Sequence, residues 1–222
     1  MSESVLIADE TLGYGAAVVL SGVTFTLRPQ ERIVLLGRSG AGKSTLLSTI
    51  YRRLADRGER VALVPQDQAL VPQLSAFHNV YMGRLDRHSP FYNLANLCWP
   101  MAVERAGVAA ALSAVGLEGQ VWQHIEQMSG GQKQRVAVAR AIFRGGNVLI
   151  ADESVSAVDG AQAIRLLTEI EERFPTTIVA LHDVDLALSH GTRVIGLKGC
   201  RIAFDRPRNE LTRGAIDDLY RV

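Results

Sequence analysis

Hydrophobic residues follow two different periods along this chain, and each period predicts a kind of secondary structure. Apolar and polar residues alternate from Ser21 to Leu27, which is the pattern of a half-buried strand. Other short runs are continuously apolar, as in strands buried on both faces of a parallel sheet: residues 32–37, 61–65, 148–151 and 178–181. Helical stripes lie between these runs, at residues 43–56 and 163–173. Strands that alternate with helices predict an α/β fold.

The middle of the chain has a different character. Residues 71–142 contain no run typical of a buried strand but several helical stretches, one of them at 101–115. We therefore expect one domain over residues 1–222, in which 1–70 and 143–222 form the α/β core and 71–142 form an inserted helical lobe. After Arg193 we expect two short strands and a terminal helix.

Composition narrows the class of protein without identifying it. The chain has 222 residues, 47% of them hydrophobic and 21% charged, which is ordinary for a globular protein with its own core. A net charge of +1 predicts no nucleic-acid partner. No run of 18 apolar residues predicts a membrane span, and the acidic N-terminal stretch does not resemble a secretory signal. Cys98 and Cys200 stand in no metal-ligand spacing, which favours a reducing compartment.

A glycine-rich segment between a predicted strand and a predicted helix is the first candidate for chemistry. It reads Gly37-Arg-Ser-Gly-Ala-Gly-Lys-Ser44 and matches the pattern G-x-x-x-x-G-K-S in the context which that pattern requires. We expect backbone N–H groups and the helix N-terminus to converge on a phosphate, Lys43 to reach the β- and γ-phosphates, and Ser44 to bind Mg²⁺. The candidate nucleotide-binding residues here are Gly37, Arg38, Ser39, Gly40, Ala41, Gly42, Lys43, Ser44 and Thr45.

Two acids, Asp152 and Glu153, end the predicted strand at 148–151. Alone they could be solvated residues that cap a turn. In a chain with a phosphate loop, Asp152 suits Mg²⁺ and Glu153 suits the attacking water. The sequence thus predicts a nucleoside triphosphatase that uses Mg²⁺.

A second anion site is predicted at Met128-Ser-Gly-Gly-Gln132. Ser129 and Gln132 have the spacing of a capping box, and Gly130 and Gly131 expose amides at the helix start. The segment could be a bare helix start. Two anion sites in one chain make sense if one nucleotide lies between two subunits.

With these motifs the chain resembles the nucleotide-binding subunit of an ATP-binding cassette (ABC) transporter from about Leu6 to Leu211. The resemblance implies a phosphate-loop ATPase core with a mostly parallel sheet, an N-terminal antiparallel β part and an inserted helical lobe. It also implies that two copies face each other head to tail around two ATP molecules, with Mg²⁺. Ser129 to Gln132 of one copy then contact the γ-phosphate bound by the other.

Further residue roles are implied only by this resemblance. Tyr14 resembles the aromatic residue that stacks on adenine, and Gln66 the glutamine that touches Mg²⁺ and water and links to the membrane partner. Asp159 lies in a loop that crosses the dimer seam, and His182 contacts the γ-phosphate. The implied catalytic set is Lys43, Gln66, Glu153 and His182, and the implied metal ligands are Ser44, Gln66 and Asp152.

The chain departs from the family pattern in two places that bear on structure. Ser154 stands where proline usually follows the glutamate, which predicts a looser loop. Only 23 residues separate Lys43 from Gln66, so we expect the strand pair usually found there to be absent or trimmed.

Two further segments are similar to the phosphonate-import ATPases: 79–94 and 181–205. This similarity implies an importer with a separate permease and a solute-binding protein, and a peripheral place on the cytoplasmic face of the bacterial inner membrane. The permease's cytoplasmic helix would meet the lobe near residues 66–83. Alternatives remain open: another ABC importer, an exporter or lipoprotein-release ATPase, a non-transport ABC protein, or a cassette module that has lost hydrolysis.

Overall fold

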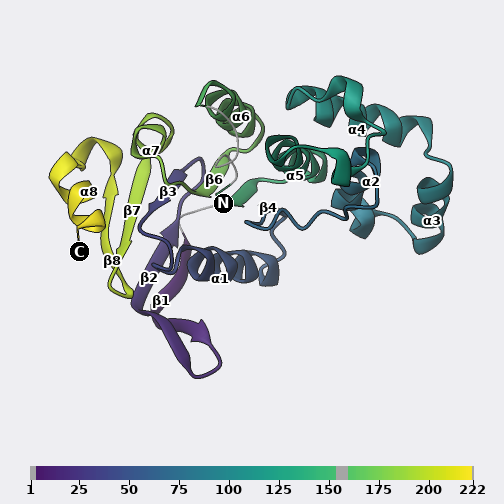
Figure 1. The fold of residues 1–222 in the computed structure, drawn as a ribbon. Helices are drawn as coiled ribbons and strands as arrows, with labels where there is room; N and C mark the ends of the chain where they lie inside the picture. The colour runs from purple at the N-terminus through teal and green to yellow at the C-terminus, as the bar shows by residue number, and fades with distance from the viewer. Residues whose placement is uncertain (1–3, 154–159, 222) are drawn as a thin grey trace.

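The computed structural model describes residues 4–153 and 160–221, in which strands alternate with helices as the apolar pattern predicts (Figure 1). The strands are β1 (Ser4–Tyr14), β2 (Ala17–Leu27), β3 (Arg32–Leu36), β4 (Val61–Val64), β5 (Val148–Asp152), β6 (Thr176–Ala180), β7 (Arg193–Lys198) and β8 (Arg201–Pro207). The α-helices are α1 (Lys43–Asp56), α2 (Ala76–Tyr81), α3 (Pro90–Cys98), α4 (Ala102–Ala114), α5 (Gly130–Arg144), α6 (Gly160–Arg173), α7 (Val184–His190) and α8 (Arg213–Tyr220). Short 3₁₀ turns cover Met82–Arg87, Glu118–Gln120, Ile125–Gln127 and Arg208–Glu210.

A six-stranded sheet in the order β4-β5-β6-β3-β7-β8 forms the centre of the molecule. Its first five strands run parallel, and β8 pairs antiparallel with β7. All five residues of β5 and all five of β6 are buried, as expected for strands covered on both faces. The strands β1 and β2 form a separate antiparallel pair. The predicted α/β fold with a mostly parallel sheet is therefore confirmed.

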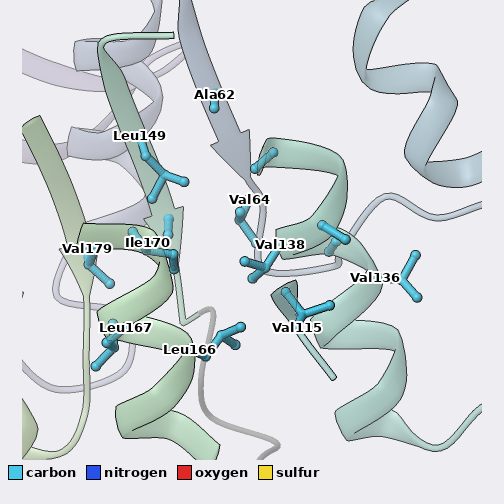
Figure 2. Close-up of a cluster of buried hydrophobic side chains, with 14 of the residues drawn as sticks. Ala62, Val64, Val115, Val136, Val138, Leu149, Leu166, Leu167, Ile170 and Val179 are labelled. Atoms are coloured by element: carbon cyan, nitrogen blue, oxygen red, sulfur yellow. The ribbon is translucent and has the colours of Figure 1, made fainter. Parts of the chain in front are cut away.

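The two faces of the sheet pack against different partners because side chains alternate along a strand. On β3, Ile33 and Leu35 face a cluster built with α1, β1 and β2. Val34 and Leu36 face the opposite cluster, which includes residues of α4 to α8. Figure 2 shows part of this second cluster, where Val138 of α5 lies beside Val64 of β4 while Val136 projects from the other side of the helix.

Four helices, α2 to α5, form the helical lobe on the β4 side of the sheet (Figure 1). The helix predicted at 101–115 is α4, and α5 packs against both α2 and α4. The same α5 also contacts β4, where Arg144 Nε donates to the Val61 carbonyl at 2.9 Å. The helix α5 is thus the element that joins the lobe to the central sheet.

Two further expectations concern the short connection between α1 and β4 and the absence of a predicted membrane span. Only four residues separate α1 from β4, so the strand pair is trimmed at this point as expected. Among the described residues, no helix has both the length and the apolar character needed to cross a bilayer. The helix α3 ends in the exposed Cys98, and the exposed Cys200 lies in the turn between β7 and β8.

Candidate functional site

The glycine-rich segment connects the end of β3 to α1, and its backbone conformation requires glycine. Gly37 has φ +151°, and a Cβ there would come within 2.6 Å of the Leu197 carbonyl oxygen. Gly42 has φ +100° and caps α1 without any side-chain cap hydrogen bond. The first amides of α1 therefore have no side-chain partner from the cap, and an anion could satisfy them.

Lys43 lies folded over this loop with only 5% of its surface exposed. Its Nζ donates to the Gly37 carbonyl at 2.9 Å and to the Arg38 carbonyl at 3.3 Å. Burial lowers the pKa of the Lys43 ammonium, and the nearby Glu153 and Asp152 carboxylates partly oppose this effect. A ligand with strong anionic oxygens would offer Lys43 better partners than these carbonyls do.

Asp152, at the end of β5, carries an unusual carboxylate. It is 7% exposed, and its Oδ1 is buried without a hydrogen-bond partner in the described part of the chain. Burial raises the pKa of Asp152, and a hydrogen bond with the Ser44 side chain opposes that rise. A buried, unpaired carboxylate oxygen beside a hydroxyl fits a hard cation such as Mg²⁺, which prefers oxygen ligands.

Glu153 is the centre of a polar cluster formed by three neighbouring strand ends. Its Oε1 lies 2.6 Å from His182 Nε2, and its Oε2 accepts from Gln66 Nε2 at 3.4 Å. Gln66 follows β4, Glu153 follows β5 and His182 follows β6, and these parallel strands are adjacent in the sheet. Their carboxyl ends therefore meet at one edge, beside the loop that follows β3.

A hollow of about 160 Å³ lies at this edge and brings the predicted residues together. It is lined by Val19, Ser39, Gly40, Gly42, Lys43, Ser44, Thr45, Gln66 and Glu153. Tyr14 lies at its rim, where its hydroxyl accepts from Thr45 Oγ1 at 3.4 Å. Its ring is available to a ligand, since 62% of the residue is exposed.

The segment at Ser129 has the predicted capping box but does not line this hollow. Ser129 Oγ accepts from the Gln132 backbone N–H at 3.3 Å, and Gln132 Oε1 accepts from the Ser129 N–H at 2.8 Å. Ser129 and Gly130 are exposed at the start of α5. This helix start is therefore open to contact from a second molecule, with the Gly130 amide as a donor that the capping box does not use. Asp159 lies outside the described residues, as does Ser154.

Two residues of α5 reach this region and were not predicted from the sequence. Gln134 Nε2 donates to the Glu153 carbonyl at 2.7 Å. Arg140 donates to the carbonyls of Gln68 and Ala69, each at 2.6 Å, in the turn that follows Gln66. A polar Gln134 within the apolar face of an otherwise regular helix is the one sequence signal that could have indicated such a contact.

Comparison with known proteins agrees with this geometry. The family model described as ABC transporter matches residues 20–156. Phosphonates import ATP-binding protein PhnC 2 of Pseudomonas aeruginosa is 37% identical, with 90% of this chain and 84% of the relative covered. The PhnC protein of Frankia casuarinae is 36% identical, with 95% and 93% covered.

Solved structures show the same fold. The dimeric structure of MJ0796, a bacterial ABC transporter cassette, superposes with a TM-score of 0.78 at 23% identity, covering 94% of this chain and all of that one. A bacterial Atm1-family ABC exporter with ATP bound gives 0.79 at 22%, covering 99% of this chain and 41% of the exporter. The fold and the site thus define an ABC-type ATPase cassette. The chain belongs to the ABC transporter family.

Proposed function

We propose that this chain is the ATP-hydrolysing subunit of an importer that takes up a phosphonate or a related phosphorus oxyanion. The observation that carries hydrolysis is the placement of Glu153, with His182 and Gln66, at the mouth of the phosphate-loop hollow. The cargo assignment rests on the names of the relatives, which are phosphonates import ATP-binding proteins from several organisms.

In this proposal the triphosphate of ATP lies in the hollow. Amides of the loop and of the α1 N-terminus bind its oxygens, Lys43 leaves the carbonyls of Gly37 and Arg38 for the β- and γ-phosphates, and Tyr14 stacks on adenine. Ser44, Asp152 and Gln66 would hold Mg²⁺, which offsets negative charge on the phosphates when bound.

Hydrolysis requires a water aligned with the γ-phosphorus. Glu153 accepts a hydrogen bond from this water and takes up its proton as the oxygen attacks, while the bond from the γ-phosphorus to the bridging oxygen breaks and ADP leaves. His182 lies against Glu153 Oε1 and so can both orient the carboxylate and contact the γ-phosphate. Gln66 holds the other carboxylate oxygen, so that its side chain links the water site to the turn after β4.

The second anion site is proposed to act on a second copy of the chain. Ser129 and Gly130 are exposed, and none of residues 129–132 lines the hollow of its own chain, so a head-to-tail homodimer would place this segment over the partner's ATP. Asp159 is proposed to lie at the seam of this dimer.

The partner in the membrane is proposed to be a permease, served by a solute-binding protein that delivers the cargo. A further hollow of about 190 Å³ opens beside Gln66, with Tyr51, Arg52 and Pro65 in its lining. A short cytoplasmic helix of the permease is proposed to dock on residues 66–83, of which Gln66 also lines this hollow. The chain would then sit peripherally on the cytoplasmic face of a bacterial inner membrane.

The Mg²⁺ assignment predicts an opposite effect of one substitution with and without ligand. Burial raises the folded-state pKa of Asp152 above its unfolded value, so its stabilising contribution is present below about pH 4 and is lost as pH rises through the folded pKa. At pH 7 Asp152→Asn should therefore raise the Tm of the ligand-free protein by about 2–4 °C. It should also remove most of the Tm increase that MgATP gives to the wild type.

Differential scanning calorimetry between pH 4 and pH 8 measures both effects. The rise in Tm of ligand-free Asp152→Asn over the wild type should grow with pH. The matched control is Asp217→Asn, at an exposed residue, which should alter neither the Tm of the ligand-free protein nor the increase given by MgATP. A variant that keeps the full MgATP-dependent rise in Tm would remove Asp152 from the metal site.

The transport assignment is tested in vesicles that contain the complete importer. With the cognate permease and binding protein, ATP hydrolysis should rise at least several-fold when a phosphonate is added with the binding protein. Sulfate and an amino acid mixture serve as control cargoes and should leave the rate unchanged. Stimulation by an unrelated cargo, with none by phosphonate or phosphite, would overturn the cargo class and leave the ATPase intact.

A further inference from the structure

The contact between Gln134 and Glu153 joins the helical lobe to the candidate water-activating residue. Gln134 is 4% exposed and lies on α5 among apolar side chains such as Val138 and Ala141. A buried amide is costly unless it is hydrogen-bonded, and Gln134 Nε2 has a short bond of 2.7 Å to the Glu153 carbonyl. This bond is directed at the backbone of Glu153, whereas the carboxylate of Glu153 contacts His182 and Gln66.

The backbone of Glu153 needs such support. Its φ is +56°, a left-handed conformation that is unfavourable for a residue with a side chain and that persists only where the surroundings impose it. The Glu153 N–H donates to the Ala180 carbonyl at 3.2 Å, and the Gln134 amide holds the carbonyl on the other side. Together the two bonds fix the peptide units from which the carboxylate projects toward His182.

The helix α5 connects Gln134 rigidly to the exposed segment at Ser129. Its first turn is closed by the capping box at Ser129, and Gln134 follows Ser129 by five positions, about 7.5 Å along the helix axis. Because both residues belong to one hydrogen-bonded helix, a shift or rotation of the exposed tip also displaces the Gln134 amide. Figure 1 shows α5 between the other lobe helices and the strands β4 and β5.

We infer that Gln134 is a positioning residue that transmits the position of α5 to Glu153 of the same chain. This inference rests on the proposed head-to-tail dimer, in which the tip of α5 closes over the partner's ATP. When the start of α5 closes over the partner's ATP, it fixes the position of the Gln134 amide. The amide then holds the Glu153 backbone in its strained conformation, and the Glu153 carboxylate can align the attacking water in its own nucleotide site. Each nucleotide site thereby reports its closure to the other site through one side chain.

The test uses Gln134→Met, which keeps the length of the side chain and removes the donor. We expect kcat to fall about tenfold, which is the effect of about 1.4 kcal/mol on the barrier. The ATP affinity, measured by equilibrium titration, should stay within twofold, because Gln134 does not line the hollow. The Hill coefficient for ATP should fall from near 2 toward 1. Gln127→Met, on an exposed glutamine of the same lobe, should change none of these values.

A second variant separates positioning from general loosening of the fold. Gln134→Glu has the same shape but directs an acceptor at the Glu153 carbonyl, so its kcat should be lower than that of Gln134→Met. A kcat within twofold of wild type for both variants, or parallel losses of kcat and ATP affinity at an unchanged Hill coefficient, would overturn the inference. Wild-type protein that hydrolyses ATP with a Hill coefficient of 1 would instead contradict the proposed dimer.

Discussion

Replacing Glu153 with glutamine should lower the ATP hydrolysis rate at least 100-fold while leaving ATP bound. General-base assistance contributes a factor of about 10²–10⁴, and an amide cannot accept the proton from water. The substitution is nearly isosteric, so the contacts with His182 and Gln66 retain partners of the same size. Removing one negative charge from the hollow should also strengthen ATP binding. Steady-state phosphate release and ATP titration measure the two effects.

The same variant reports on assembly. With ATP and Mg²⁺, Glu153→Gln should elute from gel filtration at the size of a dimer, since the closed state no longer decays by hydrolysis. The wild type should elute mostly as a monomer under the same conditions. Glu210→Gln, on an exposed carboxylate in the turn before α8, is the control for charge alone. A Glu153→Gln protein with wild-type turnover would show that another group activates the water.

Lys43→Ala should weaken ATP binding at least 100-fold. The ammonium is the one cationic group in the lining of the hollow, which also contains Glu153, and two or more charge-assisted hydrogen bonds to phosphate oxygens are lost with it. Such bonds contribute about 1.5–3 kcal/mol each, and about 2.7 kcal/mol corresponds to a factor of 100. Titration with a fluorescent ATP analogue measures the loss.

Lys198→Ala is the matched control, because this exposed lysine at the end of β7 does not line the hollow and, in the described structure, bonds the Asp218 carbonyl of α8. Lys43 also holds the Gly37 and Arg38 carbonyls, so the Tm of both variants must be compared with that of the wild type. A Lys43→Ala protein that is folded and binds ATP with near-normal affinity would contradict the phosphate-loop assignment.

The parts of the site that depend on local spacing could be predicted from the sequence. The phosphate loop and the capping box at Ser129 each lie within a few consecutive residues, so pattern and backbone geometry are tied together. Asp152 and Glu153 could be singled out as candidates because they follow a fully apolar run. Gln66 and His182 entered only through the family resemblance, and the structure brings both of them to Glu153.

Other features depend on contacts between distant segments and could not be predicted. The Glu153 backbone is left-handed, and its carbonyl is bonded to Gln134, which lies 19 residues away in a different element. The apolar pattern does not predict the strand β1 as a separate element. Its pairing with β2 has several register shifts, and these break the alternation of apolar and polar residues. The contacts of Arg140 likewise span about seventy residues of chain.

The two native cysteines lie in different parts of the molecule, so the distance between their thiols can be measured without mutagenesis. Cys98 is exposed in the helical lobe and Cys200 is exposed in the β7–β8 turn of the core. Donor and acceptor dyes attached to the native thiols would therefore report the separation of the two parts by energy transfer, with no engineered residue. A change in this separation on addition of nucleotide would then be visible in real time, in the wild type and in each variant described above.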